Sequence, residues 1–406
     1  MIAGIVGKAN VGKSTFFSAA TMKMAKIAPY PFTTIEPNVG VAYVRVPCVC
    51  KELGVEDNPR NSKCIDGVRY VPVELIDVAG LVPDAWKGRG LGNKFLDELR
   101  KADALIHVVD AAGATDEEGR PVPPGTRDPV EDVKFLDREL AMWFYQILES
   151  GWDRLIKRVK MLREKELAVL QERFSGLSLS RHHVAEALKK AGLDQKPIDK
   201  WSDEDKVEFS WKLVEIGKPT VIAANKMDLP QAEENVKRLR KEFKDRVVIP
   251  CSAEVELALR RAAEQGLIEY LPGASSFKIL KKEQLTEKQL KALKRIEELL
   301  AKWGSTGVQD VIDAAYLKVL NLIPVFPVED ATKLTDHEGN VLPDVYLVPR
   351  GTTARELAYK IHTDLGESFL YAINVKTGER VGEDYVLKEG DIIKIVATKA
   401  IRTKAR

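Results

Sequence analysis

The 406-residue sequence contains no apolar run long enough to cross a lipid bilayer, for which about 20 consecutive apolar residues are needed. Its N-terminus also lacks the basic segment, apolar core and small-residue cleavage site of a secretory signal peptide. These absences argue against a membrane-spanning or secreted protein. We therefore expect a cytoplasmic protein without a membrane partner, long enough for two or three domains.

The chain also lacks a strong net charge, because 63 Lys and Arg residues are balanced by 61 Asp and Glu residues. A globally basic surface is typical of DNA-binding proteins, so no DNA partner is expected and any basic surface must be local. Residues 151–200 contain twelve Lys and Arg against seven Asp and Glu, and no acidic residue follows Asp391. Each segment has two interpretations, a surface that binds a phosphate backbone or a solvated charged surface.

Cysteines are scarce, and three of the four lie close together at Cys48, Cys50 and Cys64. Three thiols could hold a metal ion with a fourth ligand such as Glu56 or Asp66, although the spacing is not that of a standard zinc site. The simplest interpretation is a set of reduced cysteines in a surface loop. A disulfide is a third alternative if the source is a hyperthermophile.

Strand-like and helix-like segments alternate along much of the chain, which predicts an α/β fold with a mostly parallel sheet. Strand-like runs lie at Ile2–Val6, Val41–Val46, Val73–Asp77, Ala104–Asp110, Thr220–Asn225 and Val247–Cys251, and helix-like stretches at Lys13–Met24, Lys94–Lys101 and Ala232–Phe243. In such a sheet, binding sites lie at the carboxyl ends of the strands. No internal repeat is evident.

Between Asp128 and Gly217 the strand signals give way to a long, largely helical stretch. In RLIKRVKMLREKELAVLQERF, apolar residues recur at three- and four-residue spacing, and Arg163 interrupts them. With the following HVAEALKKAG, this pattern predicts a helical hairpin inserted into the sheet domain. The apolar positions are Ile156, Val159, Leu167, Leu170 and Phe174.

The C-terminal region has a different pattern, with strand-like DVYLVP, FLYAINV and DIIKIVA around helix-like TARELAYKIH. These segments predict a small β-grasp-like module. Two helices are expected before it, one in TEKQLKALKRIEELLAKWG and a shorter one over Val308–Leu320.

The turn GKANVGKST lies between the first strand and the first helix and matches the phosphate-binding pattern GxxxxGK[ST]. Its glycines let backbone N–H groups approach phosphate oxygens, and the helix N-terminus favours an anion. Lys13 can reach the β- and γ-phosphates, and the Ser14 hydroxyl can bind Mg²⁺. The predicted nucleotide contacts of this turn are Gly7, Asn10, Val11, Gly12, Lys13, Ser14 and Thr15.

A second phosphate signal is DVAG, which follows an apolar strand. Asp77 can hold Mg²⁺ through water, and the Gly80 amide can contact the γ-phosphate. In PYPFTTIEPN, the hydroxyl of Thr33 or Thr34 could complete the magnesium shell and respond to the γ-phosphate. The predicted metal ligands are therefore Ser14, Asp77 and one of these threonines.

The pattern NKMD after a later strand predicts which base is bound. The Asp228 carboxylate can accept hydrogen bonds from guanine N1–H and the 2-amino group, and adenine offers neither donor. Asn225 would connect the base loop to the phosphate loop, and the Lys226 stem can cover the ring. After the next strand, Ser252 and Ala253 complete the expected site, with the Ala253 amide directed to guanine O6. GTP is the predicted ligand.

These motifs, with YPFTTIEPNVG and DVAGLVPDAWKGRGLGNKFLDELRKADALIHVVDA, closely resemble those of the Obg/YchF group of translation-associated GTPases. The C-terminal VYLVPRGTTARELAYKIHTDL is similar to the TGS domain of the YchF branch. The resemblance implies a P-loop GTPase domain at 1–130 and 218–320, an inserted helical or coiled-coil domain at 131–217, a β-grasp TGS domain at 323–399 and a basic tail at 400–406. It also favours Thr34 as the magnesium ligand, Gly88, Gly90 and Gly92 as part of a mobile second switch, and a ribosomal or RNA partner.

The sequence departs from the resembled group and from other GTPases in informative places. Many YchF proteins carry NxxE and favour ATP, whereas Asp228 predicts GTP here. Ras-like proteins place a water-orienting glutamine where this chain has Leu81, which predicts slow intrinsic hydrolysis. Asn10 occupies the position at which related GTPases recruit K⁺. His107, on a buried-looking strand, is expected to be a core residue rather than the missing catalyst.

The favoured hypothesis is an enzyme that hydrolyses GTP to GDP and phosphate and acts as a ribosome-associated molecular switch. Lys13, Thr34 and Gly80 are its predicted catalytic residues. The alternative is a translation-associated nucleotide-binding protein of the YchF type with ATPase activity, or one in which hydrolysis is incidental to binding. A P-loop kinase fits poorly, because the sequence provides no acceptor pocket and a kinase has no need of NKMD.

Overall fold

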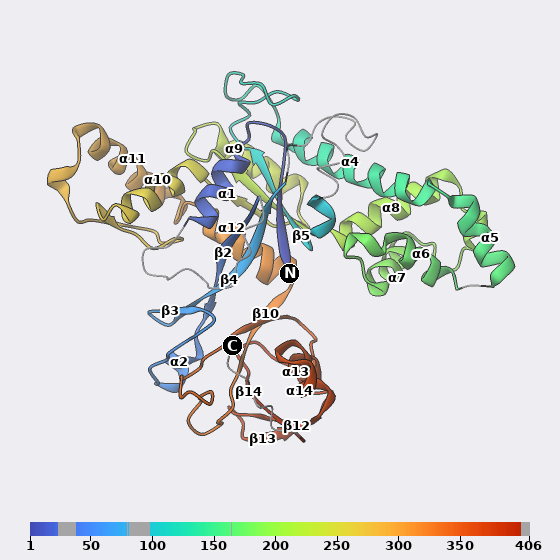
Figure 1. The fold of residues 1–406 in the computed structure, drawn as a ribbon. Helices are drawn as coiled ribbons and strands as arrows, with labels where there is room; N and C mark the ends of the chain where they lie inside the picture. Colours follow the sequence, from blue (N-terminus) through green and yellow to red (C-terminus); the bar gives the residue numbers. More distant parts are fainter. Residues whose placement is uncertain (23–37, 79, 81–97, 164, 399–406) are drawn as a thin grey trace. The chain divides into compact units, whose positions relative to one another are not determined.

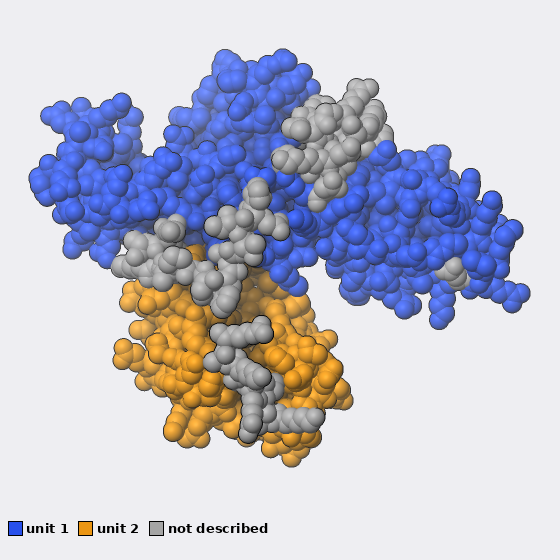
Figure 2. Space-filling model, in the orientation of Figure 1, with its two compact units in different colours: residues 1–28, 33–42, 74–315 blue, residues 29–32, 43–73, 316–406 orange. Residues whose placement is uncertain are grey.

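The computed structural model describes residues 1–22, 38–78, 80, 98–163 and 165–398 of the chain. These residues fall into two compact units (Figure 2). Unit 1 comprises the described residues up to 42 and from 74 to 315, and unit 2 comprises residues 43–73 and 316–398. None of the helices within these ranges is long and apolar enough to cross a membrane.

The larger sheet has seven strands: β1 (Ile2–Val6), β2 (Val39–Pro47), β3 (Lys63–Ile65), β4 (Val68–Asp77), β5 (Ala104–Asp110), β6 (Thr220–Asn225) and β7 (Val248–Pro250). Their order is β2-β4-β1-β5-β6-β7, and β3 pairs with β4 outside this path (Figure 1). β1 lies parallel between β4 and β5, and β6 lies parallel between β5 and β7. All seven residues of β5 are buried, as expected when both faces of a parallel sheet are covered. The predicted α/β fold is confirmed.

The described helices around this sheet include those predicted near Lys13, Ala232, Glu287 and Val308, and a helix beginning at Ala253, which was not predicted. Those outside the inserted helical segment are α1 (Lys13–Thr21), α9 (Ala232–Glu242), α10 (Ala253–Glu264), α11 (Glu287–Trp303) and α12 (Val308–Asp313). A short hairpin of β8 (Ile268–Glu269) and β9 (Lys278–Ile279) joins α10 to α11. The helix α11 has a complete capping box at Thr286 and ends at Gly304 in the left-handed conformation, as its sequence suggests.

The inserted helical segment contains five helices, and the predicted hairpin is wrong. They are α4 (Pro129–Glu149), α5 (Trp152–Leu162), α6 (Glu166–Phe174), α7 (Arg181–Lys190) and α8 (Asp203–Gly217). The expected long helix ends at Arg163, whose φ of 54° places it in the left-handed region. A right-handed helix cannot continue through that conformation, so the apolar positions of the predicted seam are divided between α5 and α6.

A continuous apolar core joins this helical segment to the sheet. Phe174 of α6 lies between Phe144 of α4 and Phe209 of α8, with ring centroids 5.8 Å and 6.2 Å away respectively. Val6 and Leu105 from the sheet belong to the same core. The helices are therefore packed as one body with the strand that leads into the phosphate-binding turn.

Unit 2 contains a five-stranded sheet of order β11-β10-β14-β12-β13. Its elements are β10 (Leu322–Pro327), β11 (Tyr346–Pro349), α13 (Ala354–Ile361), α14 (Thr363–Glu367), β12 (Phe369–Asn374), β13 (Glu379–Val381) and β14 (Ile392–Ala397). β10 and β14 are parallel, and the other pairs are antiparallel. Leu357 of α13 packs in one core with Ile323 and Ile393 of the sheet. The predicted strands and helix of the small C-terminal module are all present.

Unit 2 also includes residues 43–73, which the predicted domain boundaries assigned to the N-terminal domain. This segment contains a short helix, α2 (Val49–Leu53), followed by a loop. The backbone amides of Asn58 and Arg60 donate to the carbonyls of Val341 and Pro343 at 2.9 Å and 2.8 Å. Because backbone atoms make these contacts, the side-chain pattern of the sequence did not predict them.

His107 lies within β5 and is 1% exposed, which agrees with its predicted place in the core. Its Nδ1 has no hydrogen-bond partner among the described residues. Burial, together with the positive charges of Arg246, Lys13 and Lys8, lowers the pKa of His107 to about 3. The imidazole is therefore neutral at physiological pH.

His107 should make the protein less stable in acid. Its folded-state pKa of about 3 lies below the unfolded value of about 6.5, so the unfolded chain binds the extra proton as the pH falls below 6.5. We expect this residue to lower the free energy of unfolding by about 2 kcal/mol between pH 7 and pH 5. Urea denaturation at both pH values, for the wild type and His107→Leu, measures the difference. An equal loss in the two proteins would contradict the prediction.

Candidate nucleotide-binding site

The predicted phosphate-binding turn connects β1 to α1 at the carboxyl end of β1. Gly7 and Gly12 have φ angles of 146° and 98°, which side chains rarely adopt. A Cβ on Gly7 would lie 2.4 Å from the Val108 carbonyl oxygen, and one on Gly12 would lie 2.3 Å from Asn225 Nδ2. Glycine is therefore required at both positions, because neighbouring strands leave no room for a side chain.

Lys13 and Gly80 meet inside this turn. The Lys13 ammonium is buried and donates a hydrogen bond to the Lys8 carbonyl at 2.7 Å. Burial lowers the pKa of Lys13, and the nearby Asp77 carboxylate partly opposes that shift. A Cβ on Gly80 would lie 3.5 Å from Lys13 Nζ. The two residues predicted to contact the terminal phosphate are thus neighbours.

Ser14 and Asp77 also lie together, because the Ser14 hydroxyl donates to Asp77 Oδ2 at 3.3 Å. Asp77 Oδ1 is buried and has no hydrogen-bond partner in the part of the chain that the structure describes. Burial raises the pKa of Asp77, while the Lys13 charge and the Ser14 hydrogen bond lower it. Hydroxyl and carboxylate oxygens are ligands that Mg²⁺ prefers, so these two residues fit a magnesium site.

Asn225 connects the phosphate-binding turn to the predicted base-binding loops. This residue ends β6 and is 4% exposed. Its Nδ2 donates to the Val11 carbonyl at 2.8 Å, and its Oδ1 accepts from the Ala253 amide at 2.9 Å. One side chain thereby fixes the relative position of loops that are more than 200 residues apart in the sequence, since Val11 and Asn225 are separated by 214 residues.

The Ala253 contact differs from the expectation that this amide would bind guanine O6. Ala253 is 1% exposed, and its amide already has an acceptor in Asn225. A buried N–H needs such a partner, and Asn225 provides it within the protein. Ala253 thus orients Asn225.

Asp228, the predicted base-reading residue, is exposed and held in a defined orientation. Its Oδ1 accepts a hydrogen bond from the fully buried Ser252 hydroxyl at 2.6 Å. Ser252 also caps α10, because its oxygen accepts from the Val255 amide. The remaining carboxylate oxygen of Asp228 is the group available to donors on a base.

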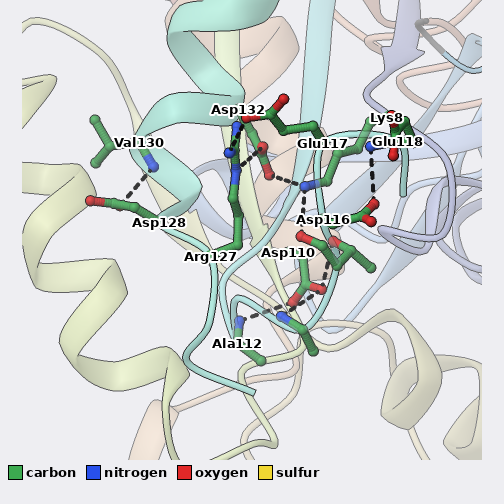
Figure 3. Close-up of polar contacts among 12 residues, drawn as sticks. Lys8, Asp110, Ala112, Asp116, Glu117, Glu118, Arg127, Asp128, Val130 and Asp132 are labelled. Carbon is green, nitrogen blue, oxygen red and sulfur yellow. Dashed lines mark hydrogen bonds and ion pairs between the residues drawn. The ribbon is translucent and has the colours of Figure 1, made fainter. Parts of the chain in front are cut away.

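The loop after β5 was not predicted to belong to the site. Asp110, at the end of β5, is 1% exposed, and Figure 3 shows its carboxylate facing the loop. It accepts hydrogen bonds from the amides of Ala112 and Ala114, each at 3.1 Å, and from the Thr115 hydroxyl at 3.0 Å. It also pairs with Lys226 Nζ at 2.7 Å. Asp110 therefore connects this loop to the NKMD segment.

The same loop is also bonded to the phosphate-binding turn. Lys8 Nζ donates to the Thr115 carbonyl at 3.0 Å and forms an ion pair with Asp132 at 2.7 Å, and both charged side chains are almost fully buried (Figure 3). Asn10 Nδ2 donates to the Gly119 carbonyl at 2.9 Å. The only sequence signal for these contacts is the high content of Gly, Pro and Asp in residues 110–128, which marks turns but no partner.

A second group of residues that the sequence analysis missed follows α11. The Ser252 amide donates to the Thr306 carbonyl at 2.8 Å. The Thr306 hydroxyl, in turn, contacts the fully buried Glu256 carboxylate, which also accepts from Tyr270 at 2.7 Å and pairs with Arg260 at 2.6 Å. Residues near 306 therefore support the loop that orients Asp228.

Thr15, another predicted nucleotide contact, lies half-buried in the first turn of α1. Other predicted residues lie outside the described part of the chain. Those outside are Thr33, Thr34, Leu81, Gly88, Gly90, Gly92, the first half of the helix expected at Lys94–Lys101 and the tail 400–406.

Comparison with known protein families gives three matches along the chain. A model described as a 50S ribosome-binding GTPase matches residues 2–143. A model described as the G4 motif-containing domain of the YGR210-like, Obg-like GTPases matches residues 223–330. The TGS domain matches residues 338–397, which confirms the predicted type of the C-terminal module.

Individual relatives extend over nearly the whole chain. An uncharacterised GTP-binding protein of Methanocaldococcus jannaschii is 54% identical over 395 residues, covering 97% of this chain and 98% of that protein. A crystal structure of a GTP-binding protein from Pyrococcus horikoshii matches with 44% identity and a TM-score of 0.80, covering 98% of this chain and 100% of the other. The protein named ribosome-binding ATPase YchF of Pasteurella multocida is 29% identical over 416 residues, covering 96% and 97% of the two chains.

The support from residues near 306 can be tested at Gly307. Its φ is 80°, and a Cβ there would lie 2.0 Å from the Pro250 carbonyl oxygen and 2.8 Å from Cys251 Cα. Gly304 has a similar φ of 84° but open space around it. We expect Gly307→Ala to lower the free energy of unfolding by about 1–3 kcal/mol more than Gly304→Ala does, because only the former forces backbone atoms apart.

Urea denaturation measures both stabilities, and titration with a fluorescent guanine nucleotide measures affinity. Gly304→Ala is the matched control, since it introduces the same side chain at a similar φ. Gly307→Ala should also weaken nucleotide binding, because the loop that carries Ser252 must move. Equal stabilities and affinities of the two variants would contradict this role.

Proposed function

This chain belongs to the YchF-related, Obg-like family of P-loop GTP-binding proteins, and on that basis we propose that it binds GTP with Mg²⁺ and hydrolyses it to GDP and phosphate as a ribosome-associated switch. The observation that carries the proposal is the connection made by Asn225, whose side chain bonds both the phosphate-binding turn and the base-binding loops. A ribosome-associated role implies a cytoplasmic location.

The choice of base rests on Asp228. Ser252 holds one of its carboxylate oxygens, and the carboxylate is proposed to accept from N1–H and the 2-amino group of guanine. Adenine has neither donor, so its binding would remove water from the carboxylate without replacing the lost hydrogen bonds. The Lys226 ammonium pairs with Asp110, and its alkyl stem is proposed to cover the base. GTP is therefore favoured over ATP.

The proposed phosphate chemistry rests on five residues. Mg²⁺ would be held by Ser14 and Asp77, with Thr34 as the proposed third ligand, and when bound it neutralises charge on the β- and γ-phosphate oxygens. Lys13 supplies a fixed positive charge, and the Gly80 amide is proposed to donate to the γ-phosphate. Because Leu81 cannot orient water by hydrogen bonding, intrinsic hydrolysis should be slow.

The partner is proposed from two independent features. Relatives such as the Pasteurella multocida protein are named ribosome-binding, and this chain matches them from end to end. Residues 151–200 carry an excess of basic residues on helices α5 to α7 and the segment after them. Basic helices suit a phosphate backbone through counterion release. GTP-dependent ordering of the loops around Thr34 and Gly80 would then control access to ribosomal RNA or protein.

One observation supports a second candidate function. The Pasteurella multocida relative is named an ATPase, and Leu81 leaves the chain without the usual water-orienting residue. The alternative is therefore a YchF-type protein with ATPase activity, or one in which hydrolysis is incidental to binding. Acceleration of turnover by ribosomes would favour the switch, and its absence would favour a structural role for the nucleotide.

Base selectivity should depend on Asp228. We expect the wild type to bind GTP more tightly than ATP, and Asp228→Ala to weaken GTP binding by about 10- to 100-fold with little change for ATP, since a hydrogen bond to a charged group contributes about 1.5–3 kcal/mol. Competitive titration against a fluorescent nucleotide gives both dissociation constants. Glu233→Ala, which changes an exposed carboxylate of α9, is the control. Tighter binding of ATP than of GTP by the wild type would defeat the proposal.

A potassium ion is the proposed activator at Asn10. We expect faster GTP hydrolysis in KCl than in NaCl at equal ionic strength, because the larger ion fits the position beside the phosphates that Asn10 marks in related GTPases. Phosphate release under both salts measures the effect. Asn10→Ala should reduce the difference between the salts, and identical wild-type rates would remove the proposal.

Ribosome association should depend on the nucleotide. In co-sedimentation with ribosomes, we expect more protein in the pellet with a non-hydrolysable GTP analogue than with GDP, because only the former supplies a γ-phosphate to order the switch loops. Binding should also weaken as salt is raised, in keeping with phosphate contacts. Equal recovery with all nucleotides would count against a switch.

A further inference from the structure

The three clustered cysteines lie in unit 2, away in sequence from every residue of the nucleotide site. Their Sγ atoms and one carboxylate oxygen of Asp57 are all within 4.8 Å of one another. Cys48 and Cys50 are each 5% exposed, so the interpretation as a surface loop is wrong. The fourth member of the cluster is Asp57, and not Glu56 or Asp66 as considered from the sequence.

Local geometry brings these four side chains together. Cys48 has an extended backbone at the start of α2, which places Cys50 in the first turn of the helix. Asp66 and Gly67, with φ angles of 52° and 81°, form a two-residue turn between β3 and β4. This tight hairpin returns the chain so that Cys64 lies opposite Arg69 and faces the helix.

The distances fit a tetrahedral metal better than a disulfide. The Sγ atoms of Cys50 and Cys64 are 3.7 Å apart, and two thiolates bound to zinc at about 2.3 Å are about 3.8 Å apart in a tetrahedron. A disulfide needs about 2.05 Å. Cys48 Sγ lies 3.1 Å from Asp57 Oδ2, also near the separation of two ligands on one ion. All four cysteines are free thiols in the structure.

The charge around the cluster also fits. Zinc with three thiolates and one carboxylate has a formal charge of about −2, which a buried site must offset. Arg69 is completely buried, and its Nη2 lies 2.7 Å from Asp57 Oδ2 and 3.2 Å from Cys48 Sγ. A guanidinium that donates to two ligands both lowers the net charge and fixes their orientation.

We propose that Cys48, Cys50, Asp57 and Cys64 bind one zinc ion that fastens residues 43–73 to the C-terminal module. Four protein ligands close the coordination shell, so the site is structural rather than catalytic. Arg69 connects it to the module, because its Nη1 donates to the Leu342 carbonyl at 3.1 Å. Because zinc binds thiolates, its binding releases the thiol protons of the cysteines.

Metal analysis of the full-length protein tests the proposal. We expect about one zinc ion per chain after purification without chelators. Zinc stripped under reducing conditions should be replaceable by Co²⁺, giving the visible absorption of a tetrahedral cobalt–thiolate centre. Cys50→Ser, Cys64→Ser and Asp57→Asn should each weaken zinc affinity by about tenfold or more.

Two variants are matched controls for zinc content. Glu56→Gln removes the exposed carboxylate next to Asp57, and Cys251→Ser removes the buried thiol of unit 1. Both should keep the ion. The wild-type Co²⁺ titration does not depend on the folding of any variant, and circular dichroism verifies that each variant is folded.

Three outcomes would overturn the site. The first is a reduced wild-type protein that takes up neither Zn²⁺ nor Co²⁺. The second is mass-spectrometric detection of a Cys50–Cys64 disulfide in protein purified under anaerobic conditions, which would assign the pair to redox chemistry. The third is loss of zinc on Glu56→Gln but not on Asp57→Asn, which would show that the ligand set is wrong.

Discussion

The nucleotide site depends on one buried side chain, the Asn225 amide. Its two ends bond the backbone of the phosphate-binding turn and the backbone of the loop that begins α10. An amide is suited to this position because it donates and accepts at the same time, so neither loop leaves a buried backbone group unpaired. The presence of this amide also requires glycine at position 12, because a Cβ on Gly12 would lie only 2.3 Å from Asn225 Nδ2. The residues that hold phosphates and base are therefore positioned before a ligand arrives.

Buried charges add a second constraint on the same region. Lys8, Lys13, Asp110 and Asp132 are each at least nine-tenths buried, and every one has a partner in the protein. Removing a charge from water without a partner is unfavourable by several kcal/mol, about the size of the whole stability of a domain. The loop after β5 can therefore adopt few conformations next to the phosphate-binding turn.

The sequence predicted most of the sheet and the family of the chain, because both leave local signals. β1, β5 and β6 begin and end where their apolar runs do, and the GxxxxGKS turn and NKMD are constrained by the shape of the ligand. The helical segment was predicted less well. Nothing in the residue type of Arg163 announces a left-handed φ, and apolar spacing alone cannot distinguish one long helix from two short ones. Lys8, Asp110 and Thr306 were missed because their partners lie far away in the sequence and many of those partners are backbone carbonyls or amides, which every residue possesses.

The same limit explains why the contacts between residues 43–73 and the C-terminal module were not predicted. Their contacts with the C-terminal module pair backbone amides near residue 58 with carbonyls near residue 341, almost 300 positions later. Side chains also take part in this association, among them Arg60, which pairs with Asp344, and Arg69, which is completely buried although arginine is among the residues least often found inside proteins. Its guanidinium requires acceptors from more than one segment, and it finds them in Asp57, Ser62 and Leu342. Arg69 and the three cysteines are visible in the sequence. Their long-range contacts could not be predicted from it, because only the structure shows that the arginine is buried.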